Sequence, residues 1–146
     1  MTRAQFPVRG DLYYDEATHI WVEPPVGGRA RCGLDPIGAD TSGDVVALSF
    51  VPEGTRVARG EAFGSLEAAK FVGPLLAPVS GIVRAHNAAV LAGPGLVNRD
   101  PFAAWLVEIE LADAAEVAAL LSGEPEVRAW FDREIERYRR KGMLAP

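Results

Sequence analysis

Short apolar segments, each followed by a glycine or proline turn, run through residues 12 to 111. Residues 45 to 51 are apolar and rich in β-branched side chains, as in a strand, and a Pro-Glu-Gly turn follows them. Residues 105 to 111 alternate in a way that is typical of a strand with one buried face and its charges outward. Many short strands joined by tight turns predict a mainly β domain.

The pattern changes to a helical one after residue 111. Asp113 is expected to be an N-cap, with Glu116 three residues later, and Gly123 is expected to end that helix. Pro125 suits the first turn of a second helix. A chain of 146 residues is long enough for one domain with a proper core. The predicted parts of this single domain, residues 1 to 146, are an N-terminal arm (1 to 11), a β-sandwich (12 to 111) and C-terminal helices (113 to 141).

The charge and the apolar pattern exclude several classes of partner. A net charge of -5 argues against a general nucleic-acid binder, because phosphate binding needs a surplus of Lys and Arg. No window has the apolar length of a membrane span, and the N-terminus lacks the apolar core of a signal peptide. The single cysteine, Cys32, cannot form an internal disulfide. We therefore expect a cytoplasmic protein without nucleic-acid or membrane partners.

Metal and nucleophile chemistry have little support in this chain. One cysteine and the two separated histidines, His19 and His86, give no ligand pair at metal spacing. Neither histidine is close in sequence to Cys32, so a buried structural thiol is expected there. The sequence predicts no metal site and no catalytic residue.

A single lysine stands in the middle of residues 64 to 81, which read GSLEAAKFVGPLLAPVSG. Strand-like segments on both sides predict a hairpin with Lys70 at its tip, between Ala69 and Phe71 and three residues after Glu67. A solvated turn lysine is the alternative. The small and apolar neighbours and the rigid support favour an amine that a modifying enzyme can reach.

Several motifs occur in the order that they have in one known family. The motifs are His19-Ile20-Trp21-Val22, Gly43-Asp44-Val45-Val46, Glu67-Ala68-Ala69-Lys70, Pro78-Val79-Ser80-Gly81, and Leu96-Val97-Asn98 with Asp100-Pro101 and Trp105. Together they resemble the H protein of the glycine cleavage system, a lipoyl carrier with a barrel-sandwich hybrid fold, over about residues 12 to 121.

The resemblance implies that lipoate is attached covalently to Lys70, with Glu67 and Phe71 beside the attachment site. The protein would then be a carrier in a multi-enzyme system and not an enzyme, because the chemistry belongs to the cofactor. Its implied partners are a lipoate-attaching enzyme, dihydrolipoamide dehydrogenase and the enzymes that load and unload the arm.

The cargo depends on where this chain departs from the family. The family's His-Glu-Trp-Val glutamate helps to hold a cationic aminomethyl group, and Ile20 replaces it here. Loss of such a contact costs about 1.5 to 3 kcal/mol, so aminomethyl cargo is disfavoured if His19, Ile20 and Trp21 line the cargo cleft. At Phe71 and the Gly73-Pro74 pair, the chain is similar to the H-like lipoate-binding proteins of bacterial sulfur oxidation.

Three functions therefore stay open at this point. The first is a carrier of sulfur intermediates for a heterodisulfide-reductase-like complex, which the resemblance favours. The second is a glycine cleavage H protein that carries the aminomethyl group between glycine decarboxylase and aminomethyltransferase. The third is an unmodified β-sandwich that acts only as an assembly module.

Overall fold

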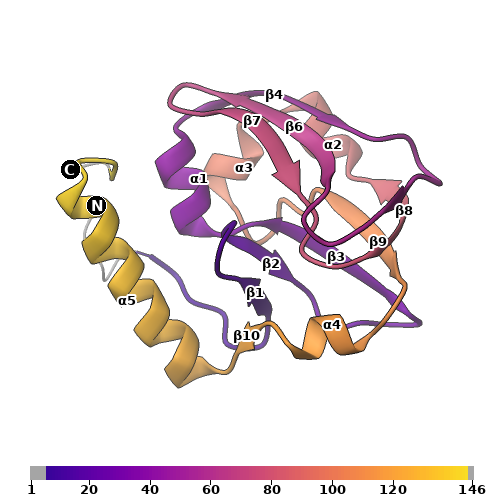
Figure 1. Ribbon diagram of the computed structural model, residues 1–146. Coiled ribbons are helices and arrows are strands. Elements are labelled where there is room, and N and C mark those ends of the chain that lie inside the picture. The colour runs from indigo at the N-terminus through magenta and orange to yellow at the C-terminus, as the bar shows by residue number, and fades with distance from the viewer. Residues whose placement is uncertain (1–5, 145–146) are drawn as a thin grey trace.

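Two antiparallel β-sheets enclose the larger hydrophobic core of the protein (Figure 1). The structure is a computed structural model that describes residues 6 to 144, so residues 1 to 5 of the predicted N-terminal arm lie outside the described residues. One sheet has seven strands in the order β10-β1-β2-β3-β9-β8-β5, and the other has three in the order β4-β6-β7. The strands are β1 (Tyr13–Asp15), β2 (Ile20–Val22), β3 (Arg29–Leu34), β4 (Val45–Phe50), β5 (Arg56–Val57), β6 (Ala62–Ala68), β7 (Val72–Leu76), β8 (Gly81–His86), β9 (Val107–Leu111) and β10 (Leu121–Ser122).

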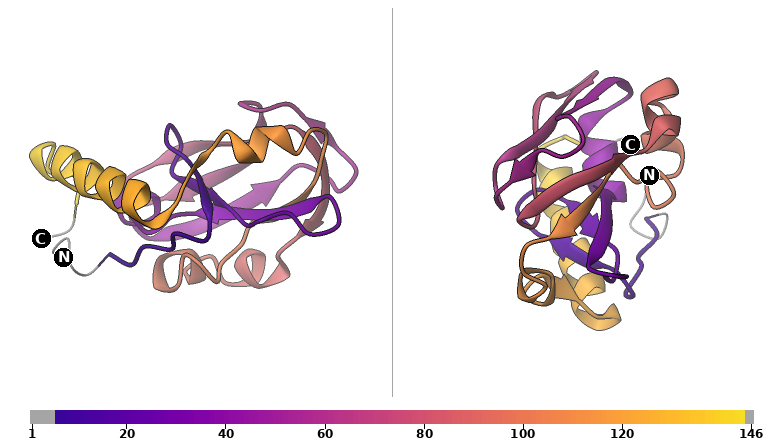
Figure 2. Two further views of the ribbon diagram at one scale, coloured as in Figure 1. Left: turned by 90° about the horizontal axis from the view of Figure 1, so that it is seen from below. Right: turned by 90° about the vertical axis from the view of Figure 1, so that its right-hand side faces the viewer.

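Helices lie around the two sheets (Figures 1 and 2). Figure 2 shows the longest helix, in yellow, extending past one end of the sheets. The helices are α1 (Pro36–Ser42), α2 (Ala88–Ala92), α3 (Leu96–Arg99), α4 (Ala115–Ala118) and α5 (Glu124–Arg140). In the part of the chain that the structure describes, no helix is long and apolar enough to cross a membrane.

The predicted hairpin around Lys70 is confirmed. Strands β6 and β7 pair with Glu67 opposite Val72, and the amide of Ala68 donates to the carbonyl of Phe71 over 2.8 Å. Lys70 therefore lies in the short turn between the two strands. The mainly β fold predicted from the short apolar segments is also confirmed.

Two regions differ from the sequence-based expectation. Residues 88 to 101 are rich in glycine and proline, which predicts an ordered loop, but they contain α2 and α3. Asn87 caps α2 by accepting a hydrogen bond from the amide of Ala89. The helix expected after Asp113 is only the short α4. Leu121 does not continue it, since this residue pairs with Tyr14 and makes β10 the edge strand of the larger sheet.

Helix α5 builds a second hydrophobic cluster outside the sandwich. Its buried side chains recur at helical spacing and form the apolar stripe of an amphipathic helix. They pack against residues from the N-terminal segment, β1, β2 and α1. Without α5, these residues would be exposed to solvent. The buried members of this cluster are Phe6, Leu12, Tyr14, Trp21, Ile37, Val127, Trp130, Phe131 and Ile135.

Candidate functional site

The turn that carries Lys70 rests on the segment between α1 and β4. The backbone amide of Lys70 donates to the carbonyl of Ser42 over 2.9 Å, and the amide of Ala69 donates to the carbonyl of Asp44 over 3.0 Å. The side chain of Lys70 remains exposed. The fold thus fixes the backbone of this residue and leaves its amine accessible, which is the arrangement that a modification site needs.

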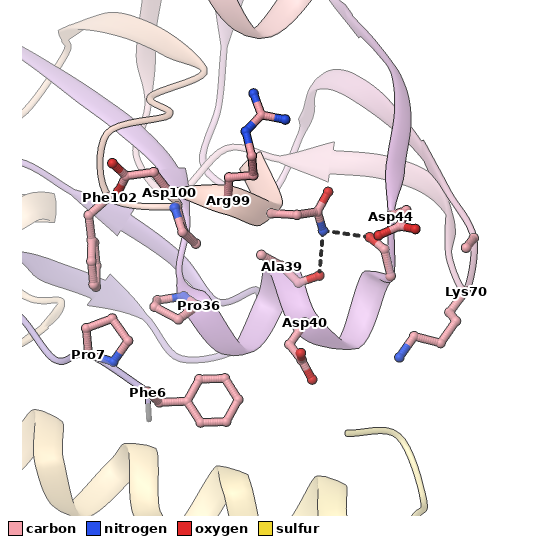
Figure 3. A pocket seen from close by; sticks show the side chains of 14 residues that line it. Phe6, Pro7, Pro36, Ala39, Asp40, Asp44, Lys70, Arg99, Asp100 and Phe102 are labelled. Carbon is pink, nitrogen blue, oxygen red and sulfur yellow. Dashed lines mark hydrogen bonds between the residues drawn. The ribbon is translucent and has the colours of Figure 1, made fainter. Parts of the chain in front are cut away.

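A cleft of about 590 Å³ opens beside Lys70. Figure 3 shows the amine of Lys70 at one end of this cleft and Asp100 and Phe102 at the other. The walls come from the N-terminal segment, α1, the lysine turn and α3 with the loop after it. The lining residues are Phe6, Pro7, Pro36, Ala39, Asp40, Gly43, Asp44, Ala69, Lys70, Asn98, Arg99, Asp100, Pro101 and Phe102.

The lining combines apolar surface with a few charged groups. Phenylalanine, proline and alanine side chains provide a surface on which an aliphatic chain can lie, as in most small-molecule sites. The carboxylates of Asp40, Asp44 and Asp100 can accept hydrogen bonds from a cation, and the guanidinium of Arg99 can donate them to an anion. The cleft therefore suits a flexible apolar arm with a polar end.

The end of α5 also reaches the lysine. The ammonium of Lys70 donates to the backbone carbonyl of Met143 over 3.3 Å. The chain turns back after α5 at Gly142, which has a φ of 69°, and the amide of Met143 donates to the carbonyl of Tyr138 over 2.9 Å. Residues from both halves of the chain thus surround one exposed amine.

Gly43 has a backbone conformation that other residues rarely adopt, with φ 77° and ψ -170°. A Cβ atom there would lie 3.1 Å from Cε of Lys70 and 3.2 Å from Cβ of Ala69. We expect Gly43→Ala to lower the free energy of unfolding by about 1 to 3 kcal/mol and to displace the lysine turn. Urea unfolding and the rate at which an amine-reactive reagent modifies Lys70 would measure the two effects.

Gly60 is the matched control for that substitution. It also has a positive φ, of 87°, but a Cβ atom there would meet nothing within 4 Å. Gly60→Ala should therefore destabilise the fold without altering the reactivity of Lys70. If both variants change that reactivity equally, the close contact between Gly43 and Lys70 is not responsible.

The two residues predicted to flank the attachment site lie near Lys70 but outside the cleft lining. Glu67 is exposed on the three-stranded sheet, opposite Val72 of β7. Phe71 is 44% exposed, and its ring lies against Gly73, where a Cβ atom would come within 2.8 Å of the ring. Both side chains belong to the surface around the turn.

The three residues predicted to line the cargo cleft lie in the protein core. His19, Ile20 and Trp21 are 4%, 1% and 2% exposed, and the cleft lining contains none of them among the described residues. The reason is that β2 is an inner strand, paired with β1 on one side and β3 on the other, with both faces covered. Ile20 therefore gives no argument against a charged cargo.

His19 instead joins α5 to α1 through a buried polar cluster. Its Nδ1 lies 2.7 Å from Oδ2 of Asp35, and its Nε2 lies 2.7 Å from Oε1 of Glu134. The ring stacks on Trp130 with centroids 4.7 Å apart. A carboxylate only accepts hydrogen bonds, so both ring nitrogens donate when the imidazole is protonated. Arg137 completes the cluster with two hydrogen bonds to Glu134.

The charges of this cluster shift two pKa values. Burial acts to lower the pKa of His19, but the neighbouring carboxylates of Asp35 and Glu134 outweigh it and raise the pKa above its usual value. Burial acts to raise the pKa of Glu134, but hydrogen bonds from Arg137 and His19 hold this pKa below its usual value. The protonated imidazole and the ionised carboxylate thus stabilise each other.

The remaining candidates offer no reactive group. Cys32 is buried, as predicted, and burial raises the pKa of its thiol to about 12, so it is no nucleophile at neutral pH. Within residues 6 to 144, no group of three or more His, Cys, Asp or Glu side chains can hold a metal ion.

Sequence reasoning missed most of the cleft. Four of the lining residues, Asn98 to Pro101, lie within the glycine- and proline-rich stretch of residues 88 to 101. The available signal was the polar run Asn98-Arg99-Asp100 directly after the apolar pair Leu96-Val97. Polar residues that follow a short apolar segment in an ordered loop are candidates for a binding site.

Comparison with known proteins agrees with this arrangement. The family model described as "Glycine cleavage H-protein" matches residues 12–132. A glycine cleavage system H protein from Beutenbergia cavernae is 43% identical over 115 residues, which is 74% of this chain and 92% of that protein. One from Mycobacterium avium is 39% identical over 119 residues, covering 78% of this chain and 89% of that protein.

A solved structure shows the same fold. The crystal structure of a glycine cleavage system H protein from Mycobacterium marinum superposes with a TM-score of 0.70 at 28% sequence identity. The match covers 92% of this chain and 99% of that one. The chain therefore belongs to the glycine cleavage H-protein family of lipoyl carriers, whose members bear a covalently attached lipoate on a lysine.

Proposed function

We propose that Lys70 is the residue that bears lipoate and that the protein carries a covalently bound intermediate between enzymes. The observation that supports this most strongly is the position of Lys70, an exposed amine on a fixed hairpin turn at the mouth of a partly apolar cleft. Lipoate, when bound, supplies a dithiol to which an intermediate can be attached. The chain itself supplies the tether, the orientation and the cleft.

The residues around Lys70 fit an arm of this kind. The two backbone hydrogen bonds to Ser42 and Asp44 hold the attachment point in place while the side chain extends from it. Tethering keeps the effective concentration of the cargo high at each docked enzyme, so the carrier needs no catalytic group of its own. The family implies a lipoate-attaching enzyme and enzymes of the glycine cleavage system as partners.

For the cargo, we propose the aminomethyl group, passed between glycine decarboxylase and aminomethyltransferase. The curated relatives named above are glycine cleavage system H proteins. The carboxylates of Asp44 and Asp100 in the cleft provide acceptors for an ammonium. Ile20 no longer opposes this cargo, because its side chain lies in the core.

A sulfur intermediate, delivered to a heterodisulfide-reductase-like complex, is the second candidate. The specific observation in its favour is the exposed apolar surface at the lysine turn, where Phe71 is 44% and Val72 is 72% exposed. A surface of this kind suits a partner with an apolar docking face. A sulfur cargo carries no ammonium, so it does not need hydrogen-bond acceptors in the cleft.

Loading with labelled glycine separates the two cargoes. Lipoylated protein is incubated with glycine decarboxylase and with glycine labelled at its methylene carbon. We expect the label to be retained on the lipoylated protein and to be absent from the same protein without lipoate. An established H protein serves as the positive control. If that control is loaded and the lipoylated protein is not, the aminomethyl proposal is wrong and the sulfur candidate takes its place.

A further inference from the structure

The amide side chain of Asn98 holds the segment on which the lysine turn rests. Its Oδ1 accepts a hydrogen bond from the amide of Val45 over 2.9 Å, and its Nδ2 donates to the carbonyl of Gly43 over 2.9 Å and to that of Ala39 over 3.4 Å. Figure 3 shows the two donated hydrogen bonds reaching from α3 to α1 and to the residue after it. Asn98 thus connects three elements at one point.

The same segment contacts the lysine turn with its alternate carbonyls. The carbonyls of Ser42 and Asp44 accept hydrogen bonds from the amides of Lys70 and Ala69, respectively. The carbonyl of Gly43 instead accepts a hydrogen bond from the side chain of Asn98. Residues 42 to 45 therefore form a bridge with the lysine turn on one side and Asn98 on the other.

We propose that Asn98 is a positioning residue for Lys70, which it orients by fixing this bridge. The proposal rests on the proposed function, in which Lys70 is the residue that an enzyme modifies. An Asn side chain carries a donor and an acceptor in one plane, and the bridge uses both. Removing it leaves the amide of Val45 and the carbonyl of Gly43 without their side-chain partner. The bridge can then shift, and the lysine turn shifts with it.

Asn87 is a matched control in the same chain. It is also an Asn with hydrogen bonds in both directions, accepting from the amide of Ala89 over 3.0 Å and donating to the carbonyl of Trp105 over 2.8 Å. It lies at the start of α2 and makes none of its described hydrogen bonds with residues 42 to 45. The stability lost in Asn87→Ala therefore measures what a buried asparagine contributes when it does not support the lysine turn.

The experiment compares Asn98→Ala, Asn98→Asp and Asn87→Ala with the full-length wild-type protein. Asn98→Asp keeps the shape and the acceptor but turns a second oxygen toward the carbonyl of Gly43. Steady-state lipoylation by a lipoate ligase gives kcat/KM, and amide hydrogen exchange reports on the hydrogen bonds of Ala69 and Lys70. Urea unfolding identifies conditions under which every variant is folded.

Both substitutions of Asn98 should lower kcat/KM for lipoylation by about tenfold, which corresponds to the loss of one or two hydrogen bonds. Exchange at the amides of Ala69 and Lys70 should accelerate by about the same factor, while the amides of β8 and β9 keep the wild-type rate. Asn87→Ala should leave lipoylation within about twofold of wild type, since Lys70 keeps its support.

Two results would overturn the role of Asn98. One is wild-type lipoylation together with wild-type exchange at Ala69 and Lys70 in Asn98→Ala. The other is an equal loss in Asn87→Ala, which would show a general effect of stability. If the wild-type protein accepts no lipoate, the proposed function fails instead, and the exchange measurement still decides whether Asn98 positions the turn.

Discussion

Lys70→Arg should abolish lipoate attachment and, with it, the whole carrier activity of the protein. Arginine keeps the positive charge and a similar length, so the turn and its contact with the C-terminal segment can persist. A guanidinium is far less nucleophilic than an amine and does not form the amide that lipoate attachment requires. Intact mass after co-expression with a lipoate ligase should show one added lipoyl group on the wild type and none on this variant.

The second lysine of the chain provides the control. Lys141 follows α5 and is exposed like Lys70, but it lies on no hairpin turn. Lys141→Arg should therefore gain the lipoyl mass as the wild type does. A lipoyl group that persists in Lys70→Arg would contradict the proposed attachment site. Absence of any added mass on the wild type would favour the unmodified assembly module.

His19→Asn should lower the free energy of unfolding by about 3 kcal/mol or more, because removing one partner of a buried ionic cluster leaves the others uncompensated. Asp35 and Glu134 would then face the vacated space with only their other hydrogen bonds. Asparagine is chosen because the backbone of His19 has a φ of 59°, which asparagine tolerates better than most residues. Urea unfolding measures the loss.

The same cluster should make stability depend on pH. The pKa of His19 is raised in the folded protein, so its contribution is complete below the pKa of about 6.5 of an unfolded histidine. The contribution is lost as the pH rises through the higher pKa of the folded state. The stability difference between wild type and His19→Asn should therefore narrow as the pH rises above about 6.5.

His86 is the control for both effects. Its Nε2 lies 2.7 Å from the carbonyl of Val51, and this half-buried ring makes no described hydrogen bond to a carboxylate. His86→Asn should cost about 1 kcal/mol, the value of one ordinary hydrogen bond. A stability difference for His19→Asn that stays constant over this pH range would show that protonation of His19 does not stabilise the fold.

The parts of this fold that could be predicted from the sequence are those with local causes. The hairpin of β6 and β7 follows from two adjacent apolar segments, and its tip follows from their spacing. Strand β10 could not be predicted, because two residues become a strand only by pairing with Tyr13 and Tyr14. The length of α4 is limited by the same distant pairing.

The site also has features with local causes, which could be predicted, and features with distant causes, which could not. Lys70 stands out by its neighbours in the sequence, but its cleft is assembled from segments that are distant in the sequence. The motif containing Ile20 was placed at the cleft by resemblance, yet it is buried, with Ile20 in the core of the sandwich and Trp21 in the cluster under α5. The partners of His19 lie 16 and 115 residues away, so no local pattern could indicate them.

The pairing of β1 with β10 also means that the larger sheet is completed late in synthesis. The three-stranded sheet with the lysine turn uses only residues 45 to 76, whereas the larger sheet is incomplete until residues 121 and 122 leave the ribosome. A single domain generally folds as a unit, so the larger sheet cannot be completed before these residues are available. The contact of Lys70 with Met143, which follows α5, likewise forms only after the chain has been synthesised to residue 143.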